Sequence, residues 1–488
     1  MILRGSFLFL TVGIIGFFSY SQQDTLPFRI DSSKKLSAER LADKKESWFL
    51  TGLPRFSYDP IQGIEIGARG QLFYNADRED PFFSFTPYRL RTDVSLSYSQ
   101  NGKAAAKVLF DMPYFLNTKW RTRMRFSFAD NPNKPYFGIG ESSLAPLSYR
   151  DPYSSEVNSN MRFDDYVEAL KTVRPGVEEN GENPDLLYTD RYYNWIHYRK
   201  FAFDAFMERT LMDGKLRWVN GLGIINLKYF QYDFQMVDDA LDLDGNRVSA
   251  INGLTRVTED YQQSMNDPEN SYWHQNNITG YEGGFLVKLK TGLIYDTRDF
   301  EPDPSKGELI EASVGYSPSW LGSDFNYVRM QFQAMKFIDV MQFLPNKENI
   351  LAGRIMFSGI QGSSIFFREV FDIWSASQGR LGVLGGEDAL RGYKKFRFGG
   401  MVYGVANIEL RSQIVNFSLL KQDFKISAVP FIDAGRVWDG LNQISLKDTR
   451  YSPGFGLRIA WNQSTILRAD YSYSKEDSQV FFVIGHIF

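Results

Sequence analysis

The sequence predicts an all-β protein, a 16-stranded antiparallel transmembrane β-barrel of the outer membrane with a long loop between strands 11 and 12. Aromatic residues make up 16% of the 488 residues, glycines number 40 and only 23% of residues are charged, which fits long alternating strands. Many segments alternate apolar and polar side chains with period two. After the first twenty residues, no stretch offers the about 20 apolar residues that a spanning helix needs.

The composition also removes several classes of function. The chain has no cysteine, which excludes a disulfide scaffold, a thiolate metal site and a cysteine nucleophile. A net charge of -3 argues against a nucleic-acid partner. The three histidines, His197, His274 and His486, are scattered, and no G-x-S-x-G motif occurs. We therefore expect no enzyme activity, metal or cofactor, and the acidic run at 238–246 is more typical of an exposed loop than of a calcium site.

The first residues have the order of an export signal. Arg4 precedes an apolar run at 7–18 and the small residues around Ser21, which predicts a signal peptide over 1–21. The alternative is a membrane anchor, for which the run is short. Residues 22–47 are rich in charge and predict a short periplasmic segment or a plug in the lumen, and 48–488 is predicted to be the barrel.

Alternation along the chain gives the strands in order. At 285–296 apolar side chains occupy one face, while Lys288 and Lys290 occupy the other. Because a charge at the lipid midplane costs roughly 2–4 kcal/mol, the polar face must turn to the lumen. The same criterion predicts sixteen strands, at 48–58, 63–75, 86–99, 103–112, 118–129, 190–209, 214–233, 280–295, 307–317, 325–340, 349–360, 398–413, 422–437, 450–461, 464–473 and 479–488. The alternatives are fourteen or eighteen strands, or a soluble pair of β-sandwiches.

The lengths of the connections predict which end of the barrel faces outward. With the N-terminus in the periplasm, every odd-numbered connection lies outside the cell. The three longest, 130–189, 234–279 and 361–397, are the fifth, seventh and eleventh. Long loops outside and short turns inside are the rule for such barrels, so the chain is predicted to be a multi-pass protein embedded in outer-membrane lipid.

The last predicted strand, 479–488, carries aromatic and branched residues at alternate positions and ends on an aromatic residue. Phe482, Ile484 and Phe488 form this pattern. A terminal aromatic residue on a last strand is the feature that bacterial barrel-assembly machinery recognises. We therefore expect that machinery as the partner for the insertion of this chain.

Four motifs in the C-terminal half resemble one known family. They are Leu390-Arg391-Gly392-Tyr393, Phe431-Ile432-Asp433-Ala434-Gly435, the turn Asp296-Thr297-Arg298-Asp299 followed by Gly307, and the last strand. Together they resemble the BamA/TamA superfamily, also called the bacterial surface antigen family, whose members insert or translocate proteins at outer membranes. The resemblance implies a long lumen-inserted loop between strands 11 and 12, which carries the first motif. The resemblance is strong over 280–488 and is limited to strand character over 48–280.

The sequence departs from this family before the barrel. Members of the assembly type carry periplasmic POTRA domains there, whereas 22–47 is shorter than the about 40 residues that a small domain needs. The resemblance therefore implies a short form without these domains, which would rely on a separate periplasmic partner or act on few protein clients.

The first two motifs predict a loop latch. Arg391 must leave bulk water if its loop enters the barrel, and a buried guanidinium needs carboxylates. Glu409 and Asp433 lie on the inward faces of adjacent predicted strands, so we expect a charge-assisted pair of Arg391 with one or both. In the alternative, Arg391 is solvated and Asp433 pairs with Arg458.

The residues around the latch have predicted roles of their own. Gly392 is expected to let the backbone turn, and Tyr393 to pack on the barrel wall. Gly435 is expected to leave room for the loop.

The leading interpretation is a barrel that assists insertion or translocation of proteins, or lipid transfer, through its wall. This requires a weak seam between the first and last strands, and Pro54 and Gly485 weaken the ladder there. The alternatives are a passive porin-like channel, and a structural or surface-binding protein that acts through its long loops at 130–189 and 234–279.

Overall fold

The structure is a computed structural model of the whole chain. It describes residues 26–30, 35–36, 41, 44–59, 61–151, 153–154, 156–178, 181–212, 215–299, 303–340, 348–377, 379–382, 384–419, 422–461, 465–484, 486 and 488. The predicted signal peptide, 1–21, lies outside these residues. No helix in this part of the chain is long and apolar enough to cross a membrane.

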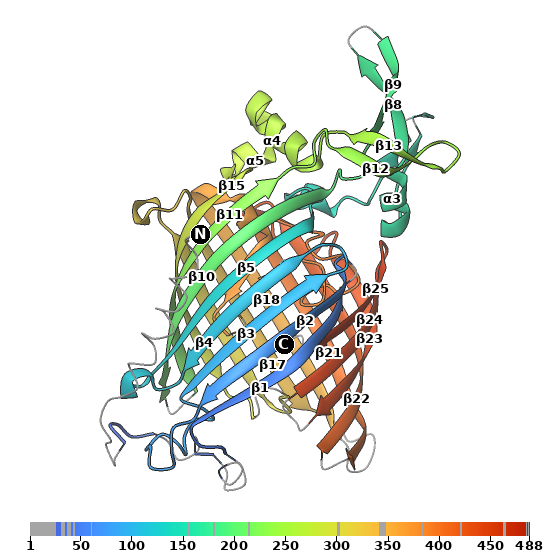
Figure 1. Cartoon of the computed structure of the whole chain (residues 1–488). Coiled ribbons are helices and arrows are strands. Elements are labelled where there is room, and N and C mark those ends of the chain that lie inside the picture. The colour runs from blue at the N-terminus through green and yellow to red at the C-terminus, as the bar shows by residue number, and fades with distance from the viewer. Residues whose placement is uncertain are drawn as a thin grey trace.

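Sixteen long strands form one closed antiparallel sheet, as predicted (Figure 1). They are β1 (Trp48–Asp59), β2 (Gly63–Tyr74), β3 (Leu90–Ser99), β4 (Ala104–Met112), β5 (Trp120–Pro135), β10 (Trp195–Leu211), β11 (Leu216–Phe230), β15 (Gly283–Asp296), β16 (Gly307–Ser317), β17 (Asn326–Asp339), β18 (Asn349–Phe366), β21 (Val402–Leu419), β22 (Gln422–Trp438), β23 (Arg450–Trp461), β24 (Thr465–Tyr473) and β25 (Ser478–Ile484). Each pairs with the next, and β1 meets β25 to close the barrel. The two-residue strand β14 (Ile278–Thr279) adds a short parallel pairing to β18.

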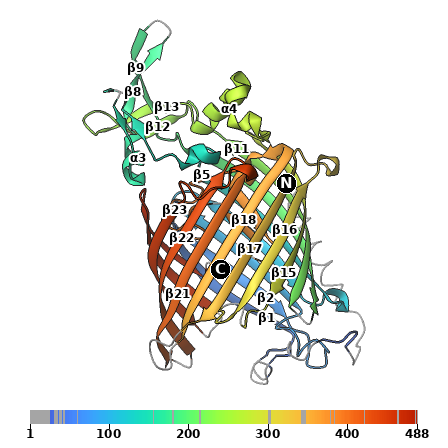
Figure 2. The same cartoon turned by 180° about the vertical axis from the view of Figure 1, so that it is seen from behind.

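The barrel wall exposes its apolar side chains and buries its polar ones, the reverse of a soluble protein. In β17, Met330 and Phe332 are exposed, whereas Arg329 and Gln331, which alternate with them, are buried. A β-sandwich buries its apolar faces, so this pattern excludes the soluble alternative. Apolar side chains on the outside and polar ones in the lumen are the arrangement that lipid requires. Figure 2 shows β15 to β18 and β21 to β23 as one continuous, tilted wall.

Several predicted strand ends are wrong. β5 continues to Pro135, because the wall residues after 129 still find partners on β10, such as Ile196 opposite Lys134. β18 continues to Phe366, and β21 runs from Val402 to Leu419 rather than over 398–413. The loop between strands 11 and 12 therefore spans 367–401 instead of 361–397. Pairing with a neighbouring strand, which local alternation does not contain, sets these ends.

The last strand is also shorter than predicted. β25 ends at Ile484, and Phe488 lies in the lumen with 6% of its surface exposed. Its ring packs near Phe337, and its carbonyl oxygen accepts a bond from Arg411 at 3.2 Å. The prediction that Phe488 belongs to the terminal wall strand is therefore wrong. The two guanidiniums of Arg354 and Arg411, 5.1 and 5.3 Å from the ring centre, give this aromatic side chain an inward site.

The fifth, seventh and eleventh connections all leave the same end of the barrel, which by their length is the extracellular end. The fifth holds η4 (Gly140–Leu144), β6 (Tyr149–Arg150), β7 (Val157–Asn158), α3 (Phe163–Ala169), β8 (Val173–Glu178) and β9 (Gly181–Thr189). The seventh holds β12 (Met236–Leu241), β13 (Arg247–Asn252), α4 (Arg256–Asn266), η6 (Pro268–Asn270), α5 (Tyr272–Gln275) and β14. β13 pairs with β9, so a four-stranded sheet joins the two connections above the rim (Figure 1).

The residues before β1 dock at the opposite, periplasmic end. Lys44 donates to the carbonyl oxygens of Phe83 and Thr86 in the β2–β3 connection, at 2.5 and 2.9 Å. Phe28 packs against Phe82 of the same connection and against Tyr114 of the β4–β5 connection. The described part of 22–47 therefore lies against the periplasmic rim, and the structure gives it no place inside the lumen.

Candidate functional site

The connection between β18 and β21 folds back into the lumen. It contains η8 (Phe367–Phe371) and the pair β19 (Asp372–Ser375) and β20 (Gly379–Gly382). At its tip, Gly385 and Gly386 have φ of 106° and 85°, values that only glycine adopts readily. The amide of Gly386 donates to the carbonyl of Tyr393 at 2.8 Å, which closes the tip into a compact turn.

Arg391 stands at this tip and binds three carboxylates from three wall strands. Its Nε and Nη2 donate to the two oxygens of Asp433 on β22, both at 2.8 Å. Its Nη1 donates to Glu409 on β21 at 2.8 Å and to Asp470 on β24 at 3.0 Å. All four side chains have no exposed surface. The structure thus brings together Arg391, Glu409 and Asp433, which the sequence singled out.

Further arginines balance the three carboxylates. Arg411 bonds to Glu409 at 3.0 Å, and Arg458 bonds to Glu409 at 3.1 Å and to Asp470. Arg468 lies 3.6 Å from Asp470. The alternative in which Arg391 is solvated and Asp433 pairs with Arg458 is therefore wrong. Arg458 serves the other two carboxylates because it is on β23, at a register opposite Arg468 and away from Asp433.

Sequence reasoning missed several partners of the loop, among them Asp470, Asn407, Ser452 and Phe431. Asn407 donates to Asp433 and to the carbonyl of Ala389 in the loop, at 2.8 and 2.7 Å. The Phe431 ring lies 3.3 Å from the Arg391 guanidinium carbon. Their inward positions in the alternating pattern were the available signal, but only the barrel register shows which inward residues meet.

The two glycines of the motifs act through close approach. A Cβ on Gly435 would lie 2.7 Å from the Leu384 side chain of the loop, so this position leaves room for the loop. Gly392 lies in a turn, as expected, in which the amide of Tyr393 donates to the carbonyl of Leu390 at 3.1 Å. Its φ is not positive, so the turn itself does not require glycine. A Cβ on Gly392 would lie 2.6 Å from the Ser452 hydroxyl and the Tyr473 carbonyl, so the backbone itself touches β23 and β24. The amide of Gly392 donates to Ser452 at 2.5 Å.

Tyr393 is buried in an apolar cluster that joins loop and wall. Its ring lies 5.1 Å from that of Phe398 in the same loop. Met356, Val405 and Val437 of the wall belong to the same cluster. Apolar packing therefore adds to the ion pairs that hold the loop.

A second buried arginine binds the loop near the extracellular mouth. Arg397 donates to Glu476 of the β24–β25 connection at 2.7 Å. It also donates to the carbonyl oxygens of Ser143 and Ala145, at 2.6 and 2.7 Å, and these residues belong to the fifth connection. Arg397 thereby joins three connections: the fifth, the eleventh and the one between β24 and β25.

The central turn motif closes the β15–β16 connection. Arg298 donates to both oxygens of Asp296, at 2.9 and 2.8 Å, and Arg217 of β11 adds a bond at 2.9 Å. Asp299 accepts from the amide of Ser305 at 3.0 Å. Gly307 has φ of 101°, and a Cβ there would lie 2.4 Å from the Thr297 carbonyl. These residues sit at the periplasmic rim, away from Arg391.

The seam between the first and last strands is short. β1 pairs with β2 along its whole length, from Trp48 opposite Tyr74 to Asp59 opposite Gly63. With β25 it shares a single described residue pair, Tyr58 and Phe482. Ile484 pairs with Leu467 of β24. Of the residues expected to form the C-terminal signal, Phe482 thus lies on the lipid face beside the seam, Ile484 ends the strand, and Phe488 is in the lumen.

The buried ion pairs of this arrangement are suited to holding the loop against the barrel wall. Within the described ranges, no group of three or more acidic, histidine or cysteine side chains could hold a metal ion. Removing one partner of a buried ion pair costs about 3–5 kcal/mol, because a charge remains unpaired. The Arg391 cluster therefore pins the loop strongly as long as all its members are present.

Comparison with known proteins places this geometry in a family. The Omp85 superfamily domain matches residues 221–488, and a domain of unknown function, DUF5982, matches 26–89. No curated protein matches. BamA from Haemophilus ducreyi lacking POTRA domains 1–3 is similar in structure, with a TM-score of 0.50 and 13% identity over 90% of this chain and 70% of that one. CdiB from Escherichia coli has a TM-score of 0.50 and 10% identity, over 90% of this chain and 63% of that one.

These likenesses agree with the barrel fold. The Omp85 match covers more than half of the 488 residues. It includes the inserted loop and the three strands, β21, β22 and β24, that bind Arg391. The chain belongs to the Omp85 superfamily and is an outer-membrane β-barrel.

Proposed function

We propose that this barrel assists the insertion or translocation of proteins at the outer membrane, or the transfer of lipid, by opening its wall between β1 and β25. The observation that carries the proposal is the seam, where only Tyr58 and Phe482 pair among the described residues. An edge strand with free backbone groups is a template for an incoming strand. The role is non-enzymatic, since it needs only pairing and release of backbone hydrogen bonds.

The inserted loop supports this role over that of a passive porin-like channel. The loop occupies the lumen and is held by Arg391 on the strands β21, β22 and β24. A porin keeps a water-filled path, whereas a barrel that works through its wall gains from a closed lumen, which limits leakage while the seam is open.

Disulfide crosslinking of the seam tests the proposal, because the natural chain has no cysteine. Tyr58→Cys with Phe482→Cys places two thiols on a directly paired position, where Cβ atoms of opposed residues lie about 4.5–5.5 Å apart. The matched control joins β1 to β2 through Phe56→Cys with Ile66→Cys, which are also opposed.

The variants would replace the natural protein in cells, followed by outer-membrane proteomics under oxidising and reducing conditions. We expect the oxidised seam variant to lose outer-membrane clients, and the control to retain them. If the oxidised seam variant kept a normal outer-membrane proteome, opening between β1 and β25 would be rejected.

A surface-binding role is a second candidate, favoured by the extracellular sheet of β12, β13, β9 and β8. This sheet stands clear of the rim with α4 and α5 beside it (Figure 1). Deleting residues 236–252 would remove two of its strands without touching the barrel wall. Loss of cell-surface binding to an extracellular partner, with an unchanged outer-membrane proteome, would favour this candidate.

A periplasmic partner completes the proposal. The periplasmic rim carries an ordered surface, made by the segment around Lys44 where it docks on the β2–β3 connection with Phe82 and Phe83. Photocrosslinking in intact cells from exposed positions such as Arg78 would identify a client or accessory protein that contacts it.

A further inference from the structure

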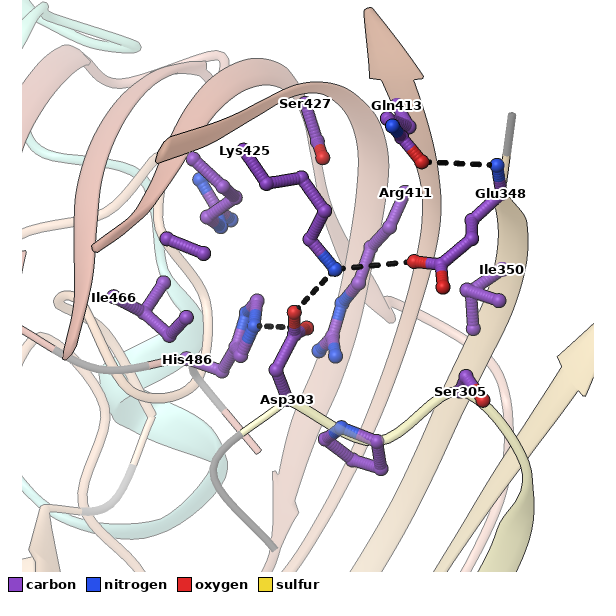
Figure 3. A pocket seen from close by; sticks show the side chains of 13 residues that line it. Asp303, Ser305, Glu348, Ile350, Arg411, Gln413, Lys425, Ser427, Ile466 and His486 are labelled. Atoms are coloured by element: carbon purple, nitrogen blue, oxygen red, sulfur yellow. Dashed lines mark hydrogen bonds and ion pairs between the residues drawn. The ribbon is translucent and has the colours of Figure 1, made fainter. Parts of the chain in front are cut away.

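A cavity lies in the lumen beside Asp303 and Ser305 of the periplasmic β15–β16 connection (Figure 3). It has a volume of about 20 Å³ and is lined by Arg411, Arg458 and His486, among others. A site needs about 10–15 Å³ on this scale to hold one water. It adjoins a larger cavity of about 570 Å³, and both are lined by Asp303 and Lys425. A small group attached to a larger body could therefore reach the inner cavity.

Three nitrogens of the inner cavity have no partner among the described residues. They are Arg411 Nη1, Arg458 Nε and His486 Nδ1, and each is buried. Buried polar atoms are nearly always bonded in native proteins, so three together at one cavity need an explanation. The two guanidinium nitrogens are obligate N–H donors.

The third nitrogen is an acceptor. His486 Nε2 lies 3.1 Å from Asp303 Oδ1 and donates to it, as the dashed line in Figure 3 shows. Burial, together with the Arg411 guanidinium, lowers the pKa of His486 to about 4, so the ring is neutral at pH 7. In a neutral ring whose Nε2 carries the proton, Nδ1 offers a lone pair.

The charges around the cavity favour an anion. The wall of the cavity carries three cations, Arg411, Arg458 and Lys425, against two carboxylates, those of Asp303 and Glu348, an excess of one positive charge. The carboxylates of Asp303 and Glu348 are already engaged by Lys425, at 2.6 and 3.1 Å. In Figure 3 the Lys425 ammonium reaches between them.

We infer that this cavity binds a phosphate group, either inorganic phosphate or a phosphomonoester that enters from the periplasmic side. Two N–H donors match two phosphate oxygens, and the lone pair of His486 matches the P–OH that phosphate still carries near neutral pH. Sulfate has the same shape but no proton to donate at this pH. The 570 Å³ cavity would take the body of a monoester.

Phosphate binding would act on the latch, because Arg411 and Arg458 both bond to Glu409, which also binds Arg391. A phosphate that draws these two guanidiniums toward the periplasm would weaken their hold on Glu409. The site goes beyond the proposed insertion role and makes the latch responsive to a small ligand.

Calorimetric titration of the full-length barrel in detergent, at about pH 6, tests the inference. At this pH both inorganic phosphate and a phosphomonoester, whose second pKa is about 6, carry a P–OH. We expect saturable binding of inorganic phosphate or glycerol phosphate, and binding of sulfate at least about tenfold weaker, the effect of about 1.4 kcal/mol for one lost bond. Tighter binding of glycerol phosphate would assign the site to a monoester, and equal binding would assign it to the free ion.

Two variants and one control make the test specific. Arg411→Gln removes one donor and His486→Phe removes the acceptor while keeping a ring, and each should weaken phosphate binding about tenfold or more. Arg397→Gln removes an equally buried arginine whose nitrogens are all bonded, and should leave phosphate binding unchanged. Absence of phosphate binding, sulfate binding as tight as phosphate, or unchanged binding by His486→Phe would overturn the assignment.

Discussion

Arg391 shows how one side chain can fix a long connection. Its guanidinium meets Glu409, Asp433 and Asp470, and its own amide also donates to Asp433, at 3.1 Å. The planar fork of arginine makes two parallel bonds to one carboxylate, which a lysine does not. The contribution of this residue therefore lies in geometry as well as in charge.

Substitution of Arg391 tests the latch directly. Arg391→Ala leaves three buried carboxylates with fewer cations and should cost about 3–5 kcal/mol. Arg391→Lys keeps the charge but loses the paired bonds to Asp433, and should cost about 1–3 kcal/mol. Limited proteolysis of the 367–401 loop and the temperature at which the folded band disappears in gel mobility would report both. Unchanged proteolysis in Arg391→Ala would remove the latch from the proposed function.

Gly435 gives a second test that leaves all charges in place. In Gly435→Ala the new methyl group lies 2.7 Å from Leu384, so the loop must shift, at a cost of about 1–3 kcal/mol. Gly353→Ala on β18 is the matched control, since a Cβ there meets nothing within 4 Å. Loop proteolysis should increase only in the first variant. Equal behaviour of the two variants would mean that Gly435 does not set the fit of the loop.

At the scale of elements, the alternation of apolar and polar residues predicted where the strands are but not where each strand begins and ends. Lys288 and Lys290 fixed the inward face of β15, because no charged residue tolerates the lipid side. The pattern at Phe488 misled, since an aromatic residue suits both a lipid-facing strand and a cation-lined lumen. Asp470 was visible as an inward residue, but its meeting with Arg391 depends on the register of strands far apart in sequence.

The inward tail predicts a measurable contribution from Phe488. Phe488→Ala removes a ring buried beside Phe337, Arg354 and Arg411, and the loss of a buried phenyl group costs about 3–5 kcal/mol. Phe482→Ala, on the lipid face of β25, is the control. The midpoint temperature of thermal unfolding in detergent should fall clearly for Phe488→Ala and little for Phe482→Ala. A larger effect of Phe482→Ala would favour the wall position that the sequence predicted.

At the scale of the whole molecule, the lumen is closed at two levels. The Arg391 cluster holds the inserted loop against β21, β22 and β24, and Arg397 ties it to the fifth connection nearer the extracellular mouth. Each level uses a buried arginine and partners from distant parts of the chain. A continuous path for ions should therefore require release of both.

Planar-bilayer conductance checks this closure. The natural barrel should conduct little, because the loop fills the lumen. The single variants Arg391→Ala and Arg397→Ala should each open briefly and rarely, and the double variant or a deletion of 367–401 should give steady, larger currents. A natural barrel that conducts as well as the deletion would favour the porin-like channel.

The docking of the N-terminal segment gives the two sides of the seam unequal freedom. β1 pairs with β2 over its 12 residues and is anchored at the periplasmic end by the Lys44 contacts. β25 pairs with β24 over only 7 residues, and the bonds of His486 and Phe488 hold the chain beyond Ile484. When the seam opens, β25 should therefore move outward while β1 stays in place. A nascent polypeptide would meet one immobile edge, which gives its assembly a fixed polarity.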